Sequence, residues 1–226
     1  MQISEIFHSL QGEGRLAGVP STFIRLAGCP LRCRWCDTPY AWSPTSGSEF
    51  TIDQVIGQTK QYPCEHVVVT GGEPLACPDL PELLKALRSI STHITIETAG
   101  LSHIANLPCD LMSISPKLSN SAPTDMKTRC QHEKQRLNIP ALTELIKEYH
   151  HQLKFVIENE TDLEEVQAHL AQLPPIPKTD ILLMPQATTR DEYIQRSPLV
   201  AELCKQAGYA FSPRLQTIIW DNKRRK

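Results

Sequence analysis

The chain has 226 residues and a formal net charge of -2, a size that favours one domain over residues 1–226 with a sizeable core. Acidic and basic residues are interspersed, so the charge pattern does not favour a nucleic-acid-binding surface, and no apolar stretch reaches the ~20 residues that a membrane span needs. The amino terminus lacks the pattern of an export signal, so we expect a cytoplasmic protein whose eight cysteines are reduced.

Strands and amphipathic helices alternate along the chain. We predict strands at residues 3–7, 22–27, 67–70, 94–96, 111–115, 153–157 and 181–184. We predict helices that begin after Thr51 and after Asp79, helices over 139–149 and 163–173, and one that begins at Ser197-Pro198 and runs to 207. The polar stretch 118–135 is expected to be a loop or lid, and 209–220 to be extended. This alternation predicts an α/β fold with a parallel sheet covered by helices.

Polar side chains stand where several of these apolar strands end, namely Thr70, Glu97, Thr98, Ser115, Lys117 and Gln186. In a parallel barrel those ends share one mouth, where active sites are built. We therefore predict that these residues gather at a single site.

Two segments before the helical region have alternative interpretations. Residues 8–15 are polar and contain two glycines, so they form either a surface turn or a loop whose backbone approaches a ligand. Arg25 lies between Ile24 and Leu26 in a predicted strand, where it faces either solvent or an anion inside the protein.

Three cysteines, Cys29, Cys33 and Cys36, lie in one short loop with CxxxCxxC spacing. Zinc sites of the structural type and ordinary [4Fe–4S] clusters use four protein ligands. Three thiolates therefore indicate either a missing fourth ligand or an iron that is kept open. A zinc site completed by His8 or His66 would make the chain a zinc-stabilised binding module. Trp35, directly before the third cysteine, offers a flat apolar surface suited to a purine.

The segment Thr70-Gly71-Gly72-Glu73-Pro74 follows a predicted buried strand, and its glycines allow the backbone to reach a ligand. The Lys-Ser/Thr pair that would complete a phosphate-binding loop is absent. Together with the cysteine loop, this segment resembles the radical S-adenosylmethionine enzymes. The resemblance implies a [4Fe–4S] cluster whose open iron binds S-adenosylmethionine, and a reaction started by a 5′-deoxyadenosyl radical.

Further segments resemble the 7-carboxy-7-deazaguanine synthase family, at residues 10–14, 22–29, 36–38, 97–100, 115–117 and 184–186. This resemblance implies conversion of 6-carboxy-5,6,7,8-tetrahydropterin to 7-carboxy-7-deazaguanine with loss of ammonia, on the pathway to queuosine and other deazapurines. It also implies a reduced or partial (β/α) barrel with the cysteine loop at its carboxyl-terminal mouth. Mg²⁺, a homodimer and an external one-electron donor such as flavodoxin or ferredoxin belong to the same expectation.

The resemblance also implies roles for individual residues. Cys29, Cys33 and Cys36 would hold the cluster, and Thr38 would bind Mg²⁺. The pterin ring would lie against Leu10, Gln11, Gly12 and Thr70, and Arg25 would pair with the substrate carboxylate. S-adenosylmethionine would be surrounded by Trp35, Cys36, Asp37, Gly72, Glu97, Ser115, Pro116, Lys117 and Gln186, with Glu97 at the ribose hydroxyls.

Several alternatives stay open at this level. Thr98 and Ser115 could be ordinary caps of strand ends, Thr38 could close a local turn, and Glu13 could contact either substrate or solvent. Gln216 stands where many members of the family have histidine. An activating enzyme for glycyl radicals would share the cysteine loop and the Gly-Gly-Glu segment, but would need a docking surface for a protein.

Overall fold

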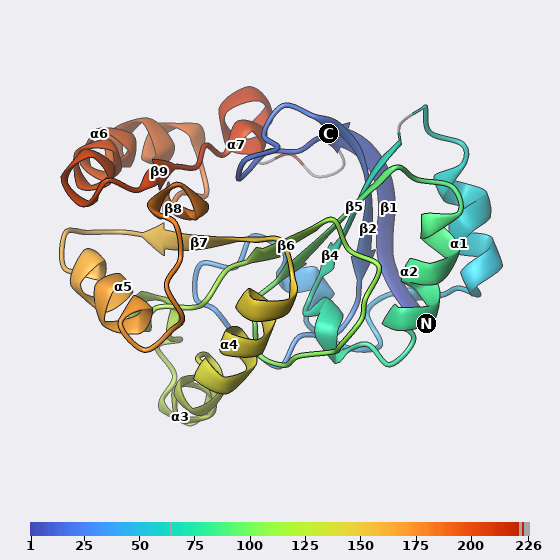
Figure 1. Ribbon diagram of the computed structural model, residues 1–226, viewed down its shortest axis with the longest axis horizontal. Coiled ribbons are helices and arrows are strands. Elements are labelled where there is room, and N and C mark those ends of the chain that lie inside the picture. Colours follow the sequence, from blue (N-terminus) through green and yellow to red (C-terminus); the bar gives the residue numbers. More distant parts are fainter. Residues whose placement is uncertain (64, 222, 224–226) are drawn as a thin grey trace.

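The computed structural model describes residues 1–63, 65–221 and 223, which form one nine-stranded sheet of order β3-β1-β2-β4-β5-β6-β7-β8-β9 (Figure 1). From β2 to β9 each neighbouring pair of strands is parallel, whereas β1 is antiparallel to both β2 and β3. The strands are β1 Gln2–Leu10, β2 Pro20–Leu26, β3 Ser48–Glu49, β4 His66–Gly71, β5 His93–Thr98, β6 Leu111–Ile114, β7 His151–Ile157, β8 Ile181–Pro185 and β9 Ala210–Phe211.

Helices lie around the outside of the curved sheet in Figure 1. They are α1 Ile52–Thr59, α2 Leu80–Arg88, α3 Met126–Gln135, α4 Ile139–Glu148, α5 Asp162–Leu170, α6 Arg190–Ala207 and α7 Leu215–Trp220. The core contains strand residues such as Ile24, Val69 and Ile96 and helix residues such as Leu83 and Leu145, none of them exposed. Each such side chain contributes roughly 1.5–3 kcal/mol by leaving water. No helix among the described residues is long and apolar enough to cross a bilayer.

The predicted α/β fold with a mainly parallel sheet is confirmed, and each predicted strand up to residue 184 is present. The helix predicted after Thr51 is also confirmed, because Thr51 and Gln54 form a reciprocal capping box at the start of α1. These elements have strong apolar periodicity or a complete local cap, which a sequence displays directly.

The first two strands differ from the rest because they form an antiparallel hairpin. The loop between them, residues 11–19 and called here the hairpin loop, is too short to hold the crossover helix that parallel neighbours need. This loop crosses to the opposite part of the sheet. There the Gly14 amide donates to Ser212 Oγ at 2.9 Å, the Leu215 amide donates to the Gly12 carbonyl at 2.9 Å, and the Arg15 amide donates to Gln152 Oε1 at 3.0 Å. The hairpin loop therefore bridges the two sides of the partial barrel.

The prediction of a loop or lid over 118–135 is wrong for its second half, which forms α3. Asp125 caps the start of this helix, because its side chain accepts a hydrogen bond from the Thr128 amide at 2.8 Å. Its one buried residue is His132, so the segment lacks the apolar stripe on which the prediction of a helix depends.

Two predictions near the carboxyl end are also wrong in detail. Helix α6 begins at Arg190, before Ser197-Pro198, because Thr189 and Glu192 form a capping box. Pro198 therefore lies inside the helix, where it removes one backbone hydrogen bond without ending it. The stretch 209–220, predicted to be extended, contains only the short strand β9 before it turns into α7.

Asp79 precedes α2 as predicted, but its side chain makes no cap hydrogen bond. Its carboxylate instead lies 3.4 Å from the amino-terminal ammonium of Met1. Asp79 thus forms an ion pair with a residue distant in the sequence in place of the local cap hydrogen bond that the sequence suggested.

Candidate active site

A cavity of about 340 Å³ lies on the inner side of the partial barrel, in the size range of small-molecule sites. Its wall is contributed by β1, β2, the hairpin loop, the cysteine loop, the ends of β4 to β8 and the start of α7. All predicted site residues line this cavity except Pro116 and Gln186. Pro116 is buried, and the Gln186 side chain accepts a hydrogen bond from Arg196.

The three cysteines Cys29, Cys33 and Cys36 line the cavity together and are free thiols. Burial raises the pKa of Cys29 to about 11 and that of Cys33 to about 12. Both are therefore protonated at neutral pH unless a metal takes the place of the proton. Three thiols on one cavity wall fit a cluster that is held by three protein ligands.

The zinc alternative is not supported by the positions of the histidines. Neither His8 nor His66 lines the cavity with the cysteines; His8 stacks on Tyr62 at 5.8 Å and His66 on His93 at 4.8 Å, measured between ring centroids. Within the described residues, no three Cys, His, Asp or Glu side chains are gathered closely enough for a single metal ion. A cluster in which each thiolate binds a different iron tolerates this wider spacing.

The Gly-Gly segment is joined directly to the cysteine loop. The Gly72 amide donates to the Leu26 carbonyl at 3.0 Å, and the Glu73 amide donates to the Gly28 carbonyl at 2.8 Å. A Cβ atom on Gly72 would lie only 2.0 Å from the Gly28 oxygen, so no larger residue fits without moving the cysteine loop. The two motifs recognised in the sequence thus form one structural unit.

The Glu73 side chain does not line the cavity, and it connects the Gly-Gly segment to the end of β5. Its carboxylate accepts hydrogen bonds from Thr98 Oγ1 at 2.5 Å and from the Ala99 amide at 2.8 Å. Burial raises the pKa of Glu73, although these hydrogen bonds oppose the rise. The hydroxyl of Thr98 thus holds the Glu73 carboxylate in place. Thr98 and Ser115 both line the cavity, and the Ser115 Oγ accepts a hydrogen bond from Lys117 Nζ at 2.9 Å.

Segment 118–135 supports the cysteine loop from the other side. The Arg32 amide donates to His132 Nδ1 at 3.3 Å, and His132 Nε2 is 2.9 Å from Ser121 Oγ. The Trp35 indole donates to the Asn120 carbonyl at 3.2 Å, which fixes the ring on the cavity wall. Because Nδ1 accepts the amide proton, the imidazole of His132 is neutral with its proton on Nε2.

We expect this neutral imidazole to make the cluster-free protein less stable in mild acid. Burial lowers the pKa of His132, so below about pH 6.5 the unfolded chain binds a proton that the native ring resists. The free energy of unfolding, measured with denaturant, should be lower at pH 5.5 than at pH 8. His132→Gln should make the difference between these two values smaller. His93 and His169, whose pKa values burial also lowers, account for a remaining decrease in the variant. An identical pH dependence in wild type and variant would contradict the assignment.

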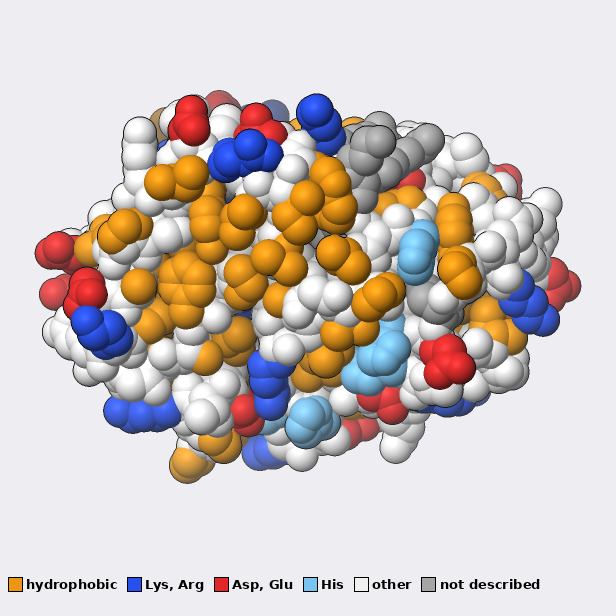
Figure 2. Space-filling view, turned by 90° about the horizontal axis from the view of Figure 1, so that it is seen from above, with side chains coloured by type: hydrophobic (Ala, Val, Ile, Leu, Met, Phe, Trp, Pro, Cys, Tyr) orange, Lys and Arg blue, Asp and Glu red, His pale blue; other side chains and the backbone are white. Residues whose placement is uncertain are grey.

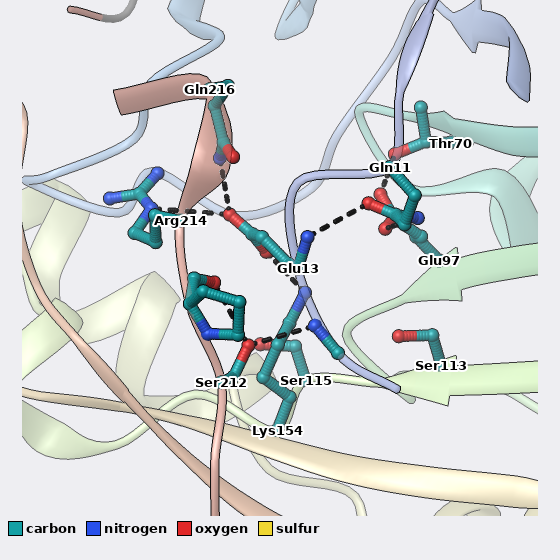
Figure 3. Close-up of polar contacts among 12 residues, drawn as sticks. Gln11, Glu13, Thr70, Glu97, Ser113, Ser115, Lys154, Ser212, Arg214 and Gln216 are labelled. Carbon is teal, nitrogen blue, oxygen red and sulfur yellow. Dashed lines mark hydrogen bonds and ion pairs between the residues drawn. The ribbon is translucent and has the colours of Figure 1, made fainter. Parts of the chain in front are cut away.

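In another part of the cavity wall, Glu97 connects two residues predicted to bind the pterin (Figure 3). It accepts hydrogen bonds from Gln11 Nε2 at 3.1 Å and from Thr70 Oγ1 at 2.9 Å. Glu97 was predicted for the cofactor, but its contacts place it in one network with Gln11 and Thr70.

Glu13 lies at the centre of a second network, between Lys154, Arg214 and Gln216 (Figure 3). It forms ion pairs with Lys154 and, at 3.2 Å, with Arg214, and it accepts from Gln216 Nε2 at 2.7 Å. Burial would raise the pKa of Glu13, but the two cations outweigh it and hold the pKa at about 2. Glu13 thus belongs to the cavity wall and not to the solvated surface.

Lys154 and Arg214 also line the cavity, although no role was predicted for them from the sequence. A lysine between Leu153 and Phe155 of a buried strand was an available signal, since an unpaired buried charge is costly. Arg214 lies in the segment Ser212-Pro213-Arg214-Leu215, which has no local feature that reveals its partners.

Gln216, the departure from the family pattern, does reach the cavity. Its Oε1 atom is buried and has no hydrogen-bond partner among the described residues. That oxygen lies against the backbone of Gly12, since a Cβ atom there would come within 1.9 Å of it. A side chain at position 12 would therefore require the end of the Gln216 side chain to move.

Arg25 lines the cavity, which agrees with the inward of its two predicted orientations. Its Nε atom donates to Glu5 Oε1 at 2.8 Å, and the Tyr40 hydroxyl donates to the same oxygen at 2.8 Å. Glu5 is buried, so it balances the charge of Arg25 in the protein without ligand.

A partial parallel barrel whose cavity holds three cysteines beside a Gly-Gly turn defines a radical S-adenosylmethionine protein, and residues 23–173 match the family model of the Radical SAM superfamily. The chain is 39% identical to 7-carboxy-7-deazaguanine synthase of Halobacterium salinarum, over 98% of the chain and 91% of that protein. It is 40% identical to the enzyme of that name from Rhodopirellula baltica, over 99% and 87%. The crystal structure of QueE from Escherichia coli is similar with a TM-score of 0.71 and 28% identity, over 93% of this chain and 92% of that one. The chain belongs to the 7-carboxy-7-deazaguanine synthase family.

Membership confirms several predictions. The protein is a radical S-adenosylmethionine enzyme with a [4Fe–4S] cluster and S-adenosylmethionine as cofactors, and its fold is the predicted partial barrel. The relatives are named 7-carboxy-7-deazaguanine synthase, which supports the function of that family and not the function of an activating enzyme for glycyl radicals. The predicted roles of single residues are not tested by these similarities and stay predictions.

Proposed function

We propose that the protein converts 6-carboxy-5,6,7,8-tetrahydropterin to 7-carboxy-7-deazaguanine with loss of ammonia, a step toward queuosine and related deazapurines. The observation that carries this proposal is one cavity in which the three cysteines face a set of hydrogen-bonding and charged side chains that suits a small polar acid. When bound, the cluster and S-adenosylmethionine supply the one-electron chemistry that starts the reaction. The task of the chain is to hold the substrate in register with that chemistry.

The residues of the hairpin loop and β4 would hold the pterin ring. Gln11 and Thr70 are already fixed by Glu97, so their positions are set before the ligand arrives. The planar guanidinium of Arg25 would bind the substrate carboxylate through two parallel hydrogen bonds. Thr38 would bind Mg²⁺. Trp35, Asp37, Gly72, Ser115 and Lys117 line the part of the cavity near the cysteines and would bind S-adenosylmethionine.

The proposal is tested by anaerobic incubation of the reconstituted protein with S-adenosylmethionine, Mg²⁺, a reductant and the carboxytetrahydropterin. Mass analysis should show 7-carboxy-7-deazaguanine and ammonia in equal amounts. Cleavage of S-adenosylmethionine without this product, under conditions in which the substrate binds, would overturn the proposal.

We expect Arg25→Lys to weaken substrate binding while leaving the cofactor reaction intact. Each charge-assisted hydrogen bond contributes on the order of 1.5–3 kcal/mol, so loss of the fork should raise the apparent substrate KM by about tenfold or more. Slow reductive cleavage of S-adenosylmethionine without substrate should persist. Arg15→Lys is a matched control, because Arg15 lies outside the cavity and pairs with Asp180 at 3.1 Å. An unchanged KM in Arg25→Lys would assign the substrate carboxylate to another residue.

We also propose that the protein is a homodimer in the cytoplasm. Flavodoxin or ferredoxin would be its one-electron donor. Figure 2 shows hydrophobic side chains gathered on the face seen from above in Figure 1, at the edge where α6 and α7 lie. Ile194 of α6 is 60% exposed and Ile219 of α7 is 45% exposed. Such a patch is typical of an interface between subunits. Sedimentation equilibrium should show a dimer that Ile219→Glu weakens, and a monomeric wild type would reject this part of the proposal.

A further inference from the structure

Arg214 is bonded at the same time to three separate loops around the cavity. Its side chain is 7% exposed; Nε donates to Glu13 Oε1 at 3.2 Å, Nη2 donates to Asp37 Oδ2 at 2.8 Å, and Nη1 donates to the Ala187 carbonyl. Glu13 belongs to the hairpin loop, Asp37 to the cysteine loop, and Ala187 to the loop after β8. A planar guanidinium can serve three such acceptors from fixed directions, which an ammonium cannot do as well.

The two carboxylates belong to two different loops of the cavity wall, one with the predicted cofactor residues and one with the predicted substrate residues. Asp37 lies between Cys36 and Thr38, and Glu13 follows Gly12 in the loop proposed to hold the pterin. Asp37 has no other side-chain hydrogen bond within the described part of the chain, and its side chain is 34% exposed. Arg214 thus links the cysteine loop directly to the hairpin loop through polar contacts in the described structure.

The charges show which side depends more on Arg214. Lys154 and Arg214 carry two positive charges, which balance the negative charges of the buried Glu13 and the partly exposed Asp37. Without Arg214, Glu13 would keep Lys154 and Gln216, whereas Asp37 would lose its only ion-pair partner among the described residues. The cysteine loop should therefore be released more than the hairpin loop.

We propose that Arg214 is a positioning residue that sets the cysteine loop relative to the bound substrate, so that cleavage of S-adenosylmethionine is coupled to product formation. This inference rests on the proposed function. Without the link, both half-sites form but lie out of register, and the radical is spent without product. A misplacement of about 1 Å can cost ~10²-fold in rate, so the coupling is sensitive to small shifts.

The test compares Arg214→Met and Arg214→Lys with the matched control Arg190→Met. Arg190 also holds α7, through hydrogen bonds to the Ile218 and Ile219 carbonyls at 2.7 Å and 3.0 Å, but it does not line the cavity. The measured quantity is 7-carboxy-7-deazaguanine formed per 5′-deoxyadenosine, with iron content and thermal stability as checks. We expect Arg214→Met to lower this ratio by about tenfold or more, Arg214→Lys to be intermediate, and Arg190→Met to keep the wild-type ratio.

Asp37→Asn gives a second, milder variant at a partly exposed position. If Arg214 acts through Asp37, the double variant should have no lower ratio of product to 5′-deoxyadenosine than Arg214→Met alone, whatever Asp37→Asn does to binding of S-adenosylmethionine. Hydrogen exchange of the cluster-free protein provides a readout apart from activity, and Arg214→Met should speed exchange in residues 29–42 more than in residues 9–19. An unchanged product ratio, equal loss in the Arg190 control, or additive effects of Asp37→Asn and Arg214→Met would overturn the inference. Wild-type protein that cleaves the cofactor but makes no product would instead reject the proposed function.

Discussion

Replacement of Cys33 by alanine is expected to abolish both the visible absorbance of the cluster and all cleavage of S-adenosylmethionine. Cys33 is 7% exposed, and its thiol lines the cavity with those of Cys29 and Cys36. With three protein ligands for a four-iron cluster, loss of one leaves two irons without protein ligands. The expected loss of activity is complete, because the reaction has no other source of the radical.

The control for this variant is Cys130→Ala, which changes an exposed cysteine on α3 outside the cavity. It should retain iron, sulfide and turnover at wild-type levels. Iron and sulfide analysis, absorbance and 5′-deoxyadenosine formation measure the outcome. A Cys33→Ala protein that kept full activity would remove the basis for assigning the cluster to this loop.

The sequence alone predicted the parts of the fold that have periodic apolar residues or complete caps. The buried strand 67–70 and the capping box after Thr51 are examples, since each is specified within a few neighbouring residues. The sequence does not predict α3, because the helix has no apolar stripe, and it predicts a start of α6 that is too late, because Ser197-Pro198 resembles a helix start. Local sequence patterns do not predict a helix whose only buried residue is a histidine, and they misplace the start of a helix that contains a proline.

The candidate site was predictable on the same principle. Cysteines within eight residues and adjacent glycines are visible as motifs, and the structure brings them to one cavity. The pairing of Glu13 with Arg214 spans 201 residues, so no local pattern reveals it. The cost of burying unpaired charges explains why Lys154, Arg214 and Glu13 must meet, but only the fold determines where.

Thr38→Val is expected to retain the cluster and bind S-adenosylmethionine, yet to lose product formation and the response to Mg²⁺. Thr38 lines the cavity, and its Oγ1 lies 3.7 Å from Cys36 Sγ. It precedes the short 3₁₀ helix Pro39–Ala41, but its side chain makes no cap hydrogen bond there, which weighs against a purely local role. The hydroxyl is thus available for a ligand beside the cysteines.

Mg²⁺ prefers about six oxygen ligands near ~2.1 Å and often takes few of them from the protein. A single neutral hydroxyl leaves the charge of the ion for the substrate carboxylate and so can fix the ring against the cysteine loop. Valine keeps the shape of threonine and removes the oxygen, and Thr45→Val, an exposed position outside the cavity, is the matched control. Turnover titrated with Mg²⁺ should rise in wild type and in the control but stay flat in Thr38→Val, with a loss of about 10²-fold at saturating metal. Normal stimulation of Thr38→Val by Mg²⁺ would show that the ion binds elsewhere.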